Sequence, residues 1–392
     1  MAKSKRGYLA FGMANILFLG FAALLNEVGS VMIMPILPMF LTSLGATGII
    51  IGLIGGLRDS VSSLLMVFGG LWADKSGKRK PFVLLGYFNS AIFKLLLAFS
   101  RTWPIALIFA SLERTGKGIR TAPRDAMIAE LIPKRHGWGF GFHRTFDKAG
   151  AVAGAILVFL LFWFLGLSFK SLFIIAAFIT FVSLAPVLFV REKKKKPKDV
   201  TLRLGLRKLP LKARLFIIIA SLFAMANFSY MFFILRAQQF FTAELAIAIP
   251  ILLFVVYNVF YAGFSIPFGA LSDRIGREKV IGAGYGLFFV TCIGFAFATN
   301  ITMLIVLFIL YGLVFAAIEG NQRAFMSDLA PEHLEATALG TFHTAVGIIA
   351  LPASLIAGFL WTIEPRFTFI FGGVIALIAA VLFYVIHGFN SR

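Results

Sequence analysis

Ionisable side chains are concentrated between residues 104 and 129, in one of the long hydrophobic stretches that recur along this chain. Four of them follow one another at intervals of four, three and four residues, so they share one face of a helix: Glu113, Lys117, Arg120 and Arg124. Groups of this kind bind protons, pair with each other or meet a charged solute. Burying one in hydrocarbon costs roughly 2.5–3.5 kcal/mol, so we expect this face to meet polar partners.

Other polar candidates lie in neighbouring apolar stretches. At 1.5 Å per residue, Asp147 is level with Arg114 and Lys117 on the preceding stretch, and we expect it to pair with one of these two. His143 has the chemistry to titrate near neutral pH, although a structural hydrogen-bonded role is the alternative. For the carboxylates, proton binding and a purely structural ion pair both stay open. The remaining candidates for a substrate or proton pathway are Glu27, Asp59, Lys94, Asn227 and Glu319.

The elements that must position these groups follow from composition. Of 392 residues 60% are hydrophobic and 14% charged, whereas soluble domains carry about a quarter charged residues. A helix needs about 20 apolar residues to cross a bilayer. Twelve stretches meet this requirement, at about 8–40, 48–73, 81–100, 104–129, 138–164, 170–190, 213–237, 246–271, 279–299, 302–325, 339–362 and 366–388. We therefore predict an all-α membrane protein with twelve transmembrane helices.

The formal net charge of +20 is distributed in a way that argues against nucleic-acid binding. Basic residues gather in alternate loops, as expected of cytoplasmic loops: Lys75, Lys78, Arg79, Lys80, Lys134, Arg135, Arg274, Arg277 and Lys279. Both termini are therefore predicted in the cytoplasm, with the first apolar stretch a span and not a cleaved signal peptide. Cys292 is the only cysteine, which excludes a disulfide framework.

A basic segment separates the first six stretches from the last six. We predict a first bundle over residues 1–190, a cytoplasmic linker over 191–214 and a second bundle over 215–392. The linker's charge either fixes topology as a solvated connection or lets it lie on anionic lipid.

The two halves repeat at a nearly constant offset. Three landmarks recur after 199 or 200 residues: Asp74 and Asp273, Arg124 and Arg323, and His143 and His343. Because each half has six stretches, the copies share one orientation and form a parallel repeat.

The loop after the second stretch reads Gly70-x-x-x-Asp74-Lys75-x-Gly77-Lys78-Arg79, and its counterpart reads Gly269-x-x-x-Asp273-Arg274-x-Gly276-Arg277. Both resemble the signature loop of the major facilitator superfamily, with Glu278 where a basic residue is usual in the second copy. The resemblance implies two six-helix bundles and a latch at these loops that stabilises the outward-facing state. A basic loop that only sets topology is the alternative.

Two further patterns resemble the superfamily's drug/proton antiporter branch. Arg114-Thr-Gly-Lys117-Gly118-Ile-Arg120 is similar to that branch's fourth-helix motif, with Lys117 in place of Gln. The run from Gly150 to Gly154 resembles its fifth-helix motif, with Ala155 in place of Pro. Small residues at this spacing let helices approach closely in lipid.

These features favour a secondary transporter of the cell membrane that works by alternating access, with proton-coupled efflux of a small amphipathic or cationic compound. The alternative is carriage of an organophosphate or carboxylate, with Lys117, Arg120 and Arg124 as counter-charges. A metal-cation exporter or a lipid flippase is less favoured. No phosphate loop, nucleophile motif or zinc motif occurs, so neither an enzyme nor a bound cofactor or metal is expected. The expected partners are a small-molecule substrate, protons and the lipid bilayer, and the chain is expected to be a monomer.

Overall fold

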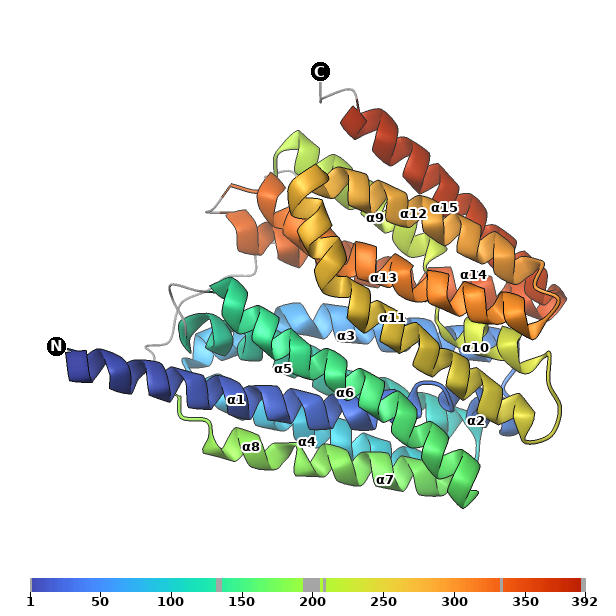
Figure 1. Cartoon of the computed structure of the whole chain (residues 1–392), viewed down its shortest axis with the longest axis horizontal. Coiled ribbons are helices and arrows are strands. Elements are labelled where there is room, and N and C mark those ends of the chain that lie inside the picture. Colours follow the sequence, from blue (N-terminus) through green and yellow to red (C-terminus); the bar gives the residue numbers. More distant parts are fainter. Residues whose placement is uncertain (1, 132–135, 193–204, 207–208, 332–333, 389–392) are drawn as a thin grey trace. The chain divides into compact units, whose positions relative to one another are not determined.

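The computed structural model describes residues 2–131, 136–192, 205–206, 209–331 and 334–388. Nearly all of their regular structure is α-helical (Figure 1). The helices are α1 (Ala2–Ile33), α2 (Leu37–Ser43), α3 (Gly48–Ser76), α4 (Lys80–Leu97), α5 (Trp103–Leu131), α6 (His136–Leu165), α7 (Phe169–Val182), α8 (Leu184–Phe189), α9 (Leu211–Ala226), α10 (Met231–Gln238), α11 (Leu245–Ile275), α12 (Arg277–Ala296), α13 (Ile301–Leu329), α14 (Glu335–Ile363) and α15 (Pro365–Gly388).

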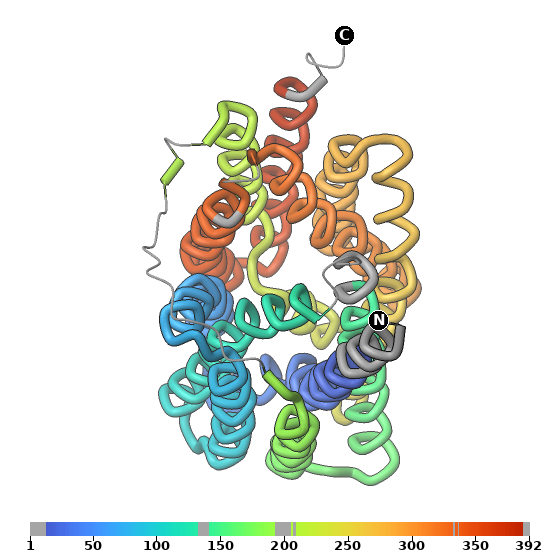
Figure 2. The backbone as a smooth tube through the Cα atoms, turned by 90° about the vertical axis from the view of Figure 1, so that its left-hand side faces the viewer, coloured from blue at the N-terminus to red at the C-terminus, as the bar shows by residue number. Residues whose placement is uncertain are grey.

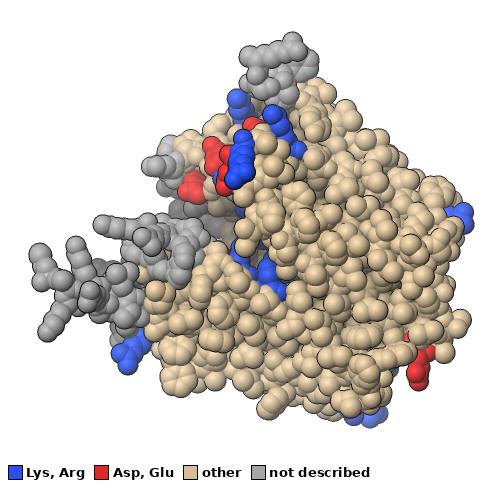
Figure 3. Space-filling view, viewed as in Figure 1, with Lys and Arg blue, Asp and Glu red and all other residues tan. Residues whose placement is uncertain are grey.

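The helices confirm the predicted all-α membrane fold. Among the described residues, 11 helical segments are long and apolar enough to cross a membrane. The twelfth predicted span is α5, whose 29 residues suffice in length; the charged residues on it explain why it is not one of the 11. The face drawn in Figure 3 is a broad uncharged surface on which charged side chains form a few small groups, as a surface in contact with lipid requires.

Three predicted spans are interrupted helices. The first divides into α1 and α2 at Pro35, because proline removes a helical hydrogen bond and clashes with the preceding turn; Pro38 lies in the first turn of α2, where proline is tolerated. The sixth divides into α7 and α8 at Ser183. The seventh divides into α9 and α10, and Asn227 ends α9 with φ −85° and ψ 63°. That break places a polar amide within an otherwise apolar span.

Tertiary contacts group the helices into two units, and α3 contributes to both. Unit 1 comprises Met1–Ile36 and Val61–Leu202. Within it α4 packs against α5 and α7, and α1 packs against α6 and α7. The approach of α6 to α1 is close: a Cβ atom on Gly150 would lie 3.0 Å from Leu24 Cα, and one on Gly154 would lie 2.9 Å from Val28 Cα. Only glycine fits at such contacts.

Unit 2 comprises Leu37–Ser60 and Arg203–Arg392. Within it α11 and α12 pack against α13, α12 packs against α15, and α9 packs against α14 and α15; the tube view in Figure 2 shows these helices nearly end-on. Aromatic pairs fill its core, with the ring centroids of Phe233 and Tyr311 4.2 Å apart. Ser60 Oγ on α3 donates to Gly347 O on α14 at 2.6 Å. The predicted bundle boundaries at 190 and 215 stay a prediction.

Candidate functional site

Lys94 on α4 is the most deeply buried cation among the described residues of unit 1, with 1% of its surface exposed. Its Nζ donates to Ser30 Oγ on α1 at 2.8 Å and to Thr180 Oγ1 on α7 at 3.0 Å. Glu113 Oε1 on α5 lies 3.8 Å from the same nitrogen. The ammonium is thus held by two hydroxyl groups and attracted by one carboxylate that is too distant for a hydrogen bond.

Glu113 lies between two cations and is 5% exposed. Besides Lys94, it has Arg114 as a partner, with Nε 3.4 Å from Oε2. Glu27 on α1 is close enough to act electrostatically on Lys94 and on Arg120. The structure therefore brings five of the predicted pathway residues into one cluster of charges: Glu27, Lys94, Glu113, Arg114 and Arg120.

Arg120 is fixed against α4. Its Nη1 donates to Ser90 Oγ at 2.9 Å, and its guanidinium carbon lies 4.8 Å from the centroid of the Tyr87 ring, in a cation–π arrangement. Ser90 Oγ in turn donates to the backbone oxygen of Glu113 at 3.2 Å. Sequence reasoning missed Tyr87 and Ser90, because an isolated Tyr or Ser in an apolar span gives no signal of its partner.

Asp147 on α6 acts electrostatically on Arg124, which also pairs with Asp125 at 2.8 Å. Arg114, one of the two partners predicted for Asp147, forms its ion pair with Glu113 instead. A pairing of Asp147 with Lys117 stays a prediction.

The predicted charged face of α5 is unevenly buried. Glu113 and Arg120 are buried, Arg124 is half-buried and Lys117 is exposed. His143 on α6 is buried, and its Nε2 has no hydrogen-bond partner among the described residues. The described residues contain no group of three His, Cys, Asp or Glu side chains that could hold a metal.

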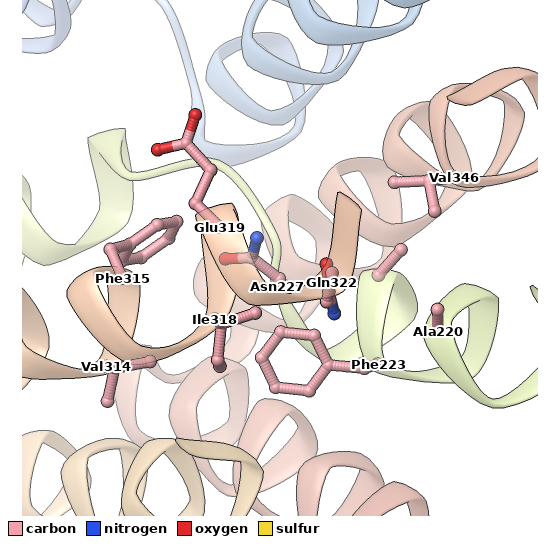
Figure 4. A pocket seen from close by; sticks show the side chains of 10 residues that line it. Ala220, Phe223, Asn227, Val314, Phe315, Ile318, Glu319, Gln322 and Val346 are labelled. Atoms are coloured by element: carbon pink, nitrogen blue, oxygen red, sulfur yellow. The ribbon is translucent and has the colours of Figure 1, made fainter. Parts of the chain in front are cut away.

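Unit 2 contains a pocket between α9, α13 and α14 (Figure 4). Asn227 and Glu319, both predicted pathway residues, line it, and Glu319 pairs with Arg323 at 3.1 Å. Gln322 also lines it and donates from Nε2 to the Tyr285 hydroxyl at 2.7 Å.

Arg58 on α3 is a buried cation that sequence reasoning missed, although the neighbouring Asp59 was among the candidates. Its Nη1 donates to the Tyr230 hydroxyl at 3.2 Å within unit 2. Asp59 itself is exposed. The sequence signal that could have identified Arg58 is that it and Asp59 are two adjacent charges inside an apolar span.

The first signature loop is closed by Arg79. Its Nη2 lies 3.2 Å from Asp74 Oδ1, its Nη1 pairs with Glu130 at the end of α5, and Nη1 also donates to Ala126 O at 3.3 Å. Burial lowers the pKa of Arg79, but the hydrogen bonds and charges of Glu130 and Asp74 outweigh burial and raise it overall. Gly77 makes the turn with φ +67°.

Glu192, the acidic residue at the start of the basic linker, caps α4. Its carboxylate accepts from the backbone N–H groups of Arg79 at 2.5 Å and Lys80 at 3.0 Å. The Lys80 ammonium donates to the carbonyl oxygens of Leu188 and Val190 at 2.7 and 2.8 Å. Carboxylates favour helix N-termini because four backbone N–H groups there lack partners.

The second signature loop forms a similar network at a shifted position. Arg277 Nη2 lies 3.4 Å from Asp273 Oδ1, and Arg277 Nε lies 2.7 Å from Asp328 Oδ2 on α13. Gly276 makes the turn with φ +99°. Gly70 lies near α5, where an added Cβ would be 3.1 Å from Ala122 Cβ, whereas Gly269 has open space beside it among the described residues.

Three basic residues of these loops, Lys75, Lys78 and Arg274, are exposed. Two of the predicted cytoplasmic basic residues, Lys134 and Arg135, lie outside the described residues.

Comparison with known proteins gives a consistent result. The sequence model of the Major Facilitator Superfamily matches residues 19–252 and 219–390. An uncharacterised MFS-type transporter of Methanocaldococcus jannaschii is 52% identical over 372 residues, which are 94% of each chain. The multidrug resistance protein MdtH of Yersinia pestis is 32% identical over 143 residues, covering 36% of this chain and 35% of MdtH. A crystal structure of a nucleoside transporter NupG variant superposes with a TM-score of 0.79 at 14% identity, over 95% of this chain and 99% of that one.

Proposed function

Because this chain belongs to the major facilitator superfamily of membrane transporters, we propose that it exports a small amphipathic or cationic compound in exchange for protons, by alternating access in the cell membrane. Both termini and the basic loops are then cytoplasmic, and the chain works as a monomer. The bundles span residues 1–190 and 215–392, joined by the linker 191–214. The loop networks of Arg79 and Arg277 latch the outward-facing state.

The observation that supports proton coupling best is the geometry of Glu113 and Lys94. A carboxylate that couples transport to protons must bind and release its proton without leaving the neighbouring buried cation without a partner. The hydrogen bonds of Lys94 to Ser30 and Thr180 do not involve Glu113, so we expect them to persist when Glu113 is protonated. At 3.8 Å the pair has no direct hydrogen bond to break.

The attraction between Lys94 and Glu113 is large enough to shift a conformational equilibrium. At an effective dielectric constant of about 20, two charges at this separation attract by about 4 kcal/mol. Protonation of Glu113 removes that attraction, which is comparable to the free-energy differences between transporter conformations that a ligand must bias. The cluster joins α1, α4, α5 and α7, so a change at Glu113 acts on four helices of unit 1.

Export of an amphipathic or cationic compound is supported by two further features. The partial similarity to a multidrug resistance protein favours the drug/proton branch that the motifs resemble. The unit 2 pocket is lined mainly by apolar side chains and contains one carboxylate, that of Glu319.

An anionic substrate, the alternative, is less well supported. Two of its proposed counter-charges are already engaged, Arg120 by Ser90 and Tyr87 and Arg124 by Asp125.

Proteoliposomes containing the full chain and a trapped pH-sensitive dye test the proposal. We expect ethidium or tetraphenylphosphonium added to one side to drive proton movement, and benzoate or glycerol phosphate to drive none. Glu113→Gln should abolish proton movement while retaining exchange of labelled cation at equilibrium. Glu364→Gln, at an exposed ion pair with Arg366, is the control and should behave as wild type. Cation transport that ignores the pH gradient, or proton movement that survives Glu113→Gln, would refute the coupling.

A further inference from the structure

The pocket of unit 2 has a polar side and an apolar side. Ten residues line it, and Glu319 is the charged one among them. Figure 4 shows the Glu319 carboxylate pointing away from the side chains of Phe223 and Ile318. A ligand that fills the pocket therefore meets hydrocarbon at one end and negative charge at the other.

The amide of Gln322 presents an acceptor to this pocket. Its Nε2 donates to the Tyr285 hydroxyl at 2.7 Å, so the carbonyl oxygen is the group left for a ligand. Tyr285 is itself fixed, because its ring stacks on Phe223 with centroids 4.0 Å apart and planes 6° apart. This rigid stack holds the acceptor and one aromatic wall in place before any ligand binds.

The opposite wall is also aromatic. Phe315 lines the pocket and contacts Tyr311 and Tyr257 edge-on, at centroid distances of 5.1 and 6.0 Å. Electron-rich ring faces attract cations, and most strongly where water is excluded. Aromatic walls, a carbonyl acceptor and a carboxylate together select a ligand with a flat apolar body and a positive N–H donor.

An ammonium ligand at Glu319 would compete with Arg323, one partner of this carboxylate. Its ion pair with Arg323 joins side chains that are 39% and 42% exposed, and ion pairs with this exposure contribute little to stability. Arg323 is not among the residues that line the pocket, so it can turn to solvent when an ammonium group approaches Glu319.

We propose that this pocket binds an aromatic compound bearing one protonated amine, with the ammonium at Glu319 and Gln322 and the ring between Phe223 and Phe315. This inference rests on the proposed function, for which it names the substrate class and the site.

Three probes with the same ring and different head groups test it: naphthylmethylamine, naphthylmethanol and naphthylacetate. Binding to the purified full chain in detergent at neutral pH is measured by calorimetry. We expect the amine to bind at least tenfold more tightly than the alcohol, and the acetate to bind most weakly. Glu319→Gln should reduce amine affinity about tenfold and leave alcohol affinity unchanged, which shows that the pocket is still folded. Glu364→Gln, which removes a carboxylate of similar exposure outside the pocket, should change neither.

Equal affinities for amine and alcohol, or tightest binding of the acetate, would overturn the proposal; so would full amine affinity in Glu319→Gln. Transport measured separately in proteoliposomes distinguishes this result from the proposed function, because binding in detergent requires no pH gradient. Charge-selective binding combined with transport that ignores the pH gradient would refute proton coupling and leave the pocket assignment standing.

Discussion

Replacing Lys94 by methionine tests whether the buried pair with Glu113 has the energy that coupling requires. The substitution removes an ammonium that is 1% exposed and lies 3.8 Å from the carboxylate. The lost attraction is about 4 kcal/mol at an effective dielectric constant of about 20. Arg114, with Nε 3.4 Å from Glu113, still compensates part of the remaining charge, so we expect Lys94→Met to destabilise the fold by about 3 kcal/mol, within the range known for broken buried pairs.

A double-mutant cycle isolates the pair. The free energy of unfolding is measured in mixed micelles for wild type, Lys94→Met, Glu113→Gln and the double variant. We expect the double variant to be more stable than Lys94→Met, because the carboxylate that Lys94 compensated is neutralised as well, and the coupling energy to be about 2–4 kcal/mol. Arg114 loses its partner in both Glu113 variants, so this loss cancels in the cycle.

The exposed pair of Arg366 and Glu364, with side chains 56% and 46% exposed, provides the matched control. Its coupling energy should be about 0–1 kcal/mol. A Lys94–Glu113 coupling energy no larger than that of the control would refute the reasoning, since a pair without energetic coupling cannot transmit protonation to four helices.

Three further substitutions test other contacts by the free energy of unfolding or by accessibility. Gly154→Val should cost about 3 kcal/mol, because its Cβ would meet the α1 backbone at Val28. Glu192→Gln should cost about 1 kcal/mol, since an amide is a weaker acceptor for the first N–H groups of α4. Arg277→Gln should leave Asp328 without its partner at 2.7 Å, and labelling of a cysteine introduced at that loop should become faster.

Two of these substitutions, Gly154→Val and Arg277→Gln, have a control on a similar element. Gly286→Ala, with open space around it among the described residues, should stabilise α12 slightly because alanine is the better helix former. Glu278 lies in the first turn of α12 but forms no ion pair among those described for unit 2. In Glu278→Gln, labelling at the loop should therefore stay at the wild-type rate. Equal losses of unfolding free energy in Gly154→Val and Gly286→Ala would show that the contact with α1 does not determine stability. Equal labelling rates in Arg277→Gln and Glu278→Gln would show that the ion pair with Asp328 does not determine the accessibility of the loop.

The sequence predicts the helices well because lipid imposes one dominant rule. A span must satisfy its backbone internally and be apolar for about 20 residues, and both requirements can be recognised within a local window. Even α5 was predictable, since its charges lie at helical spacing on a stretch of spanning length. The break at Asn227 was not, because no proline marks it and the chain turns there to meet tertiary contacts.

The partners of the charged residues were far less predictable. Lys94 binds Ser30 and Thr180, which are 64 and 86 residues away in sequence. Many hydroxyls occur in the apolar spans, and depth along a helix does not say which way each one faces. The depth argument placed Asp147 level with Arg114, yet Arg114 pairs with the neighbouring Glu113. Such contacts are decided by the direction in which each side chain points around its helix axis, and that direction depends on how the helices pack.

The two signature loops show what the repeat preserves. In the first, Asp74, Arg79 and Glu130 form the network, and in the second Asp273, Arg277 and Asp328 do so. An offset of 199 would place the second arginine at 278, where the chain has Glu278. The arginine lies one residue earlier and its partner on α13 is also one residue earlier, so both ends of the contact have moved together. Geometry is therefore maintained where sequence position is not, because a guanidinium on its flexible stem reaches two carboxylates from either position.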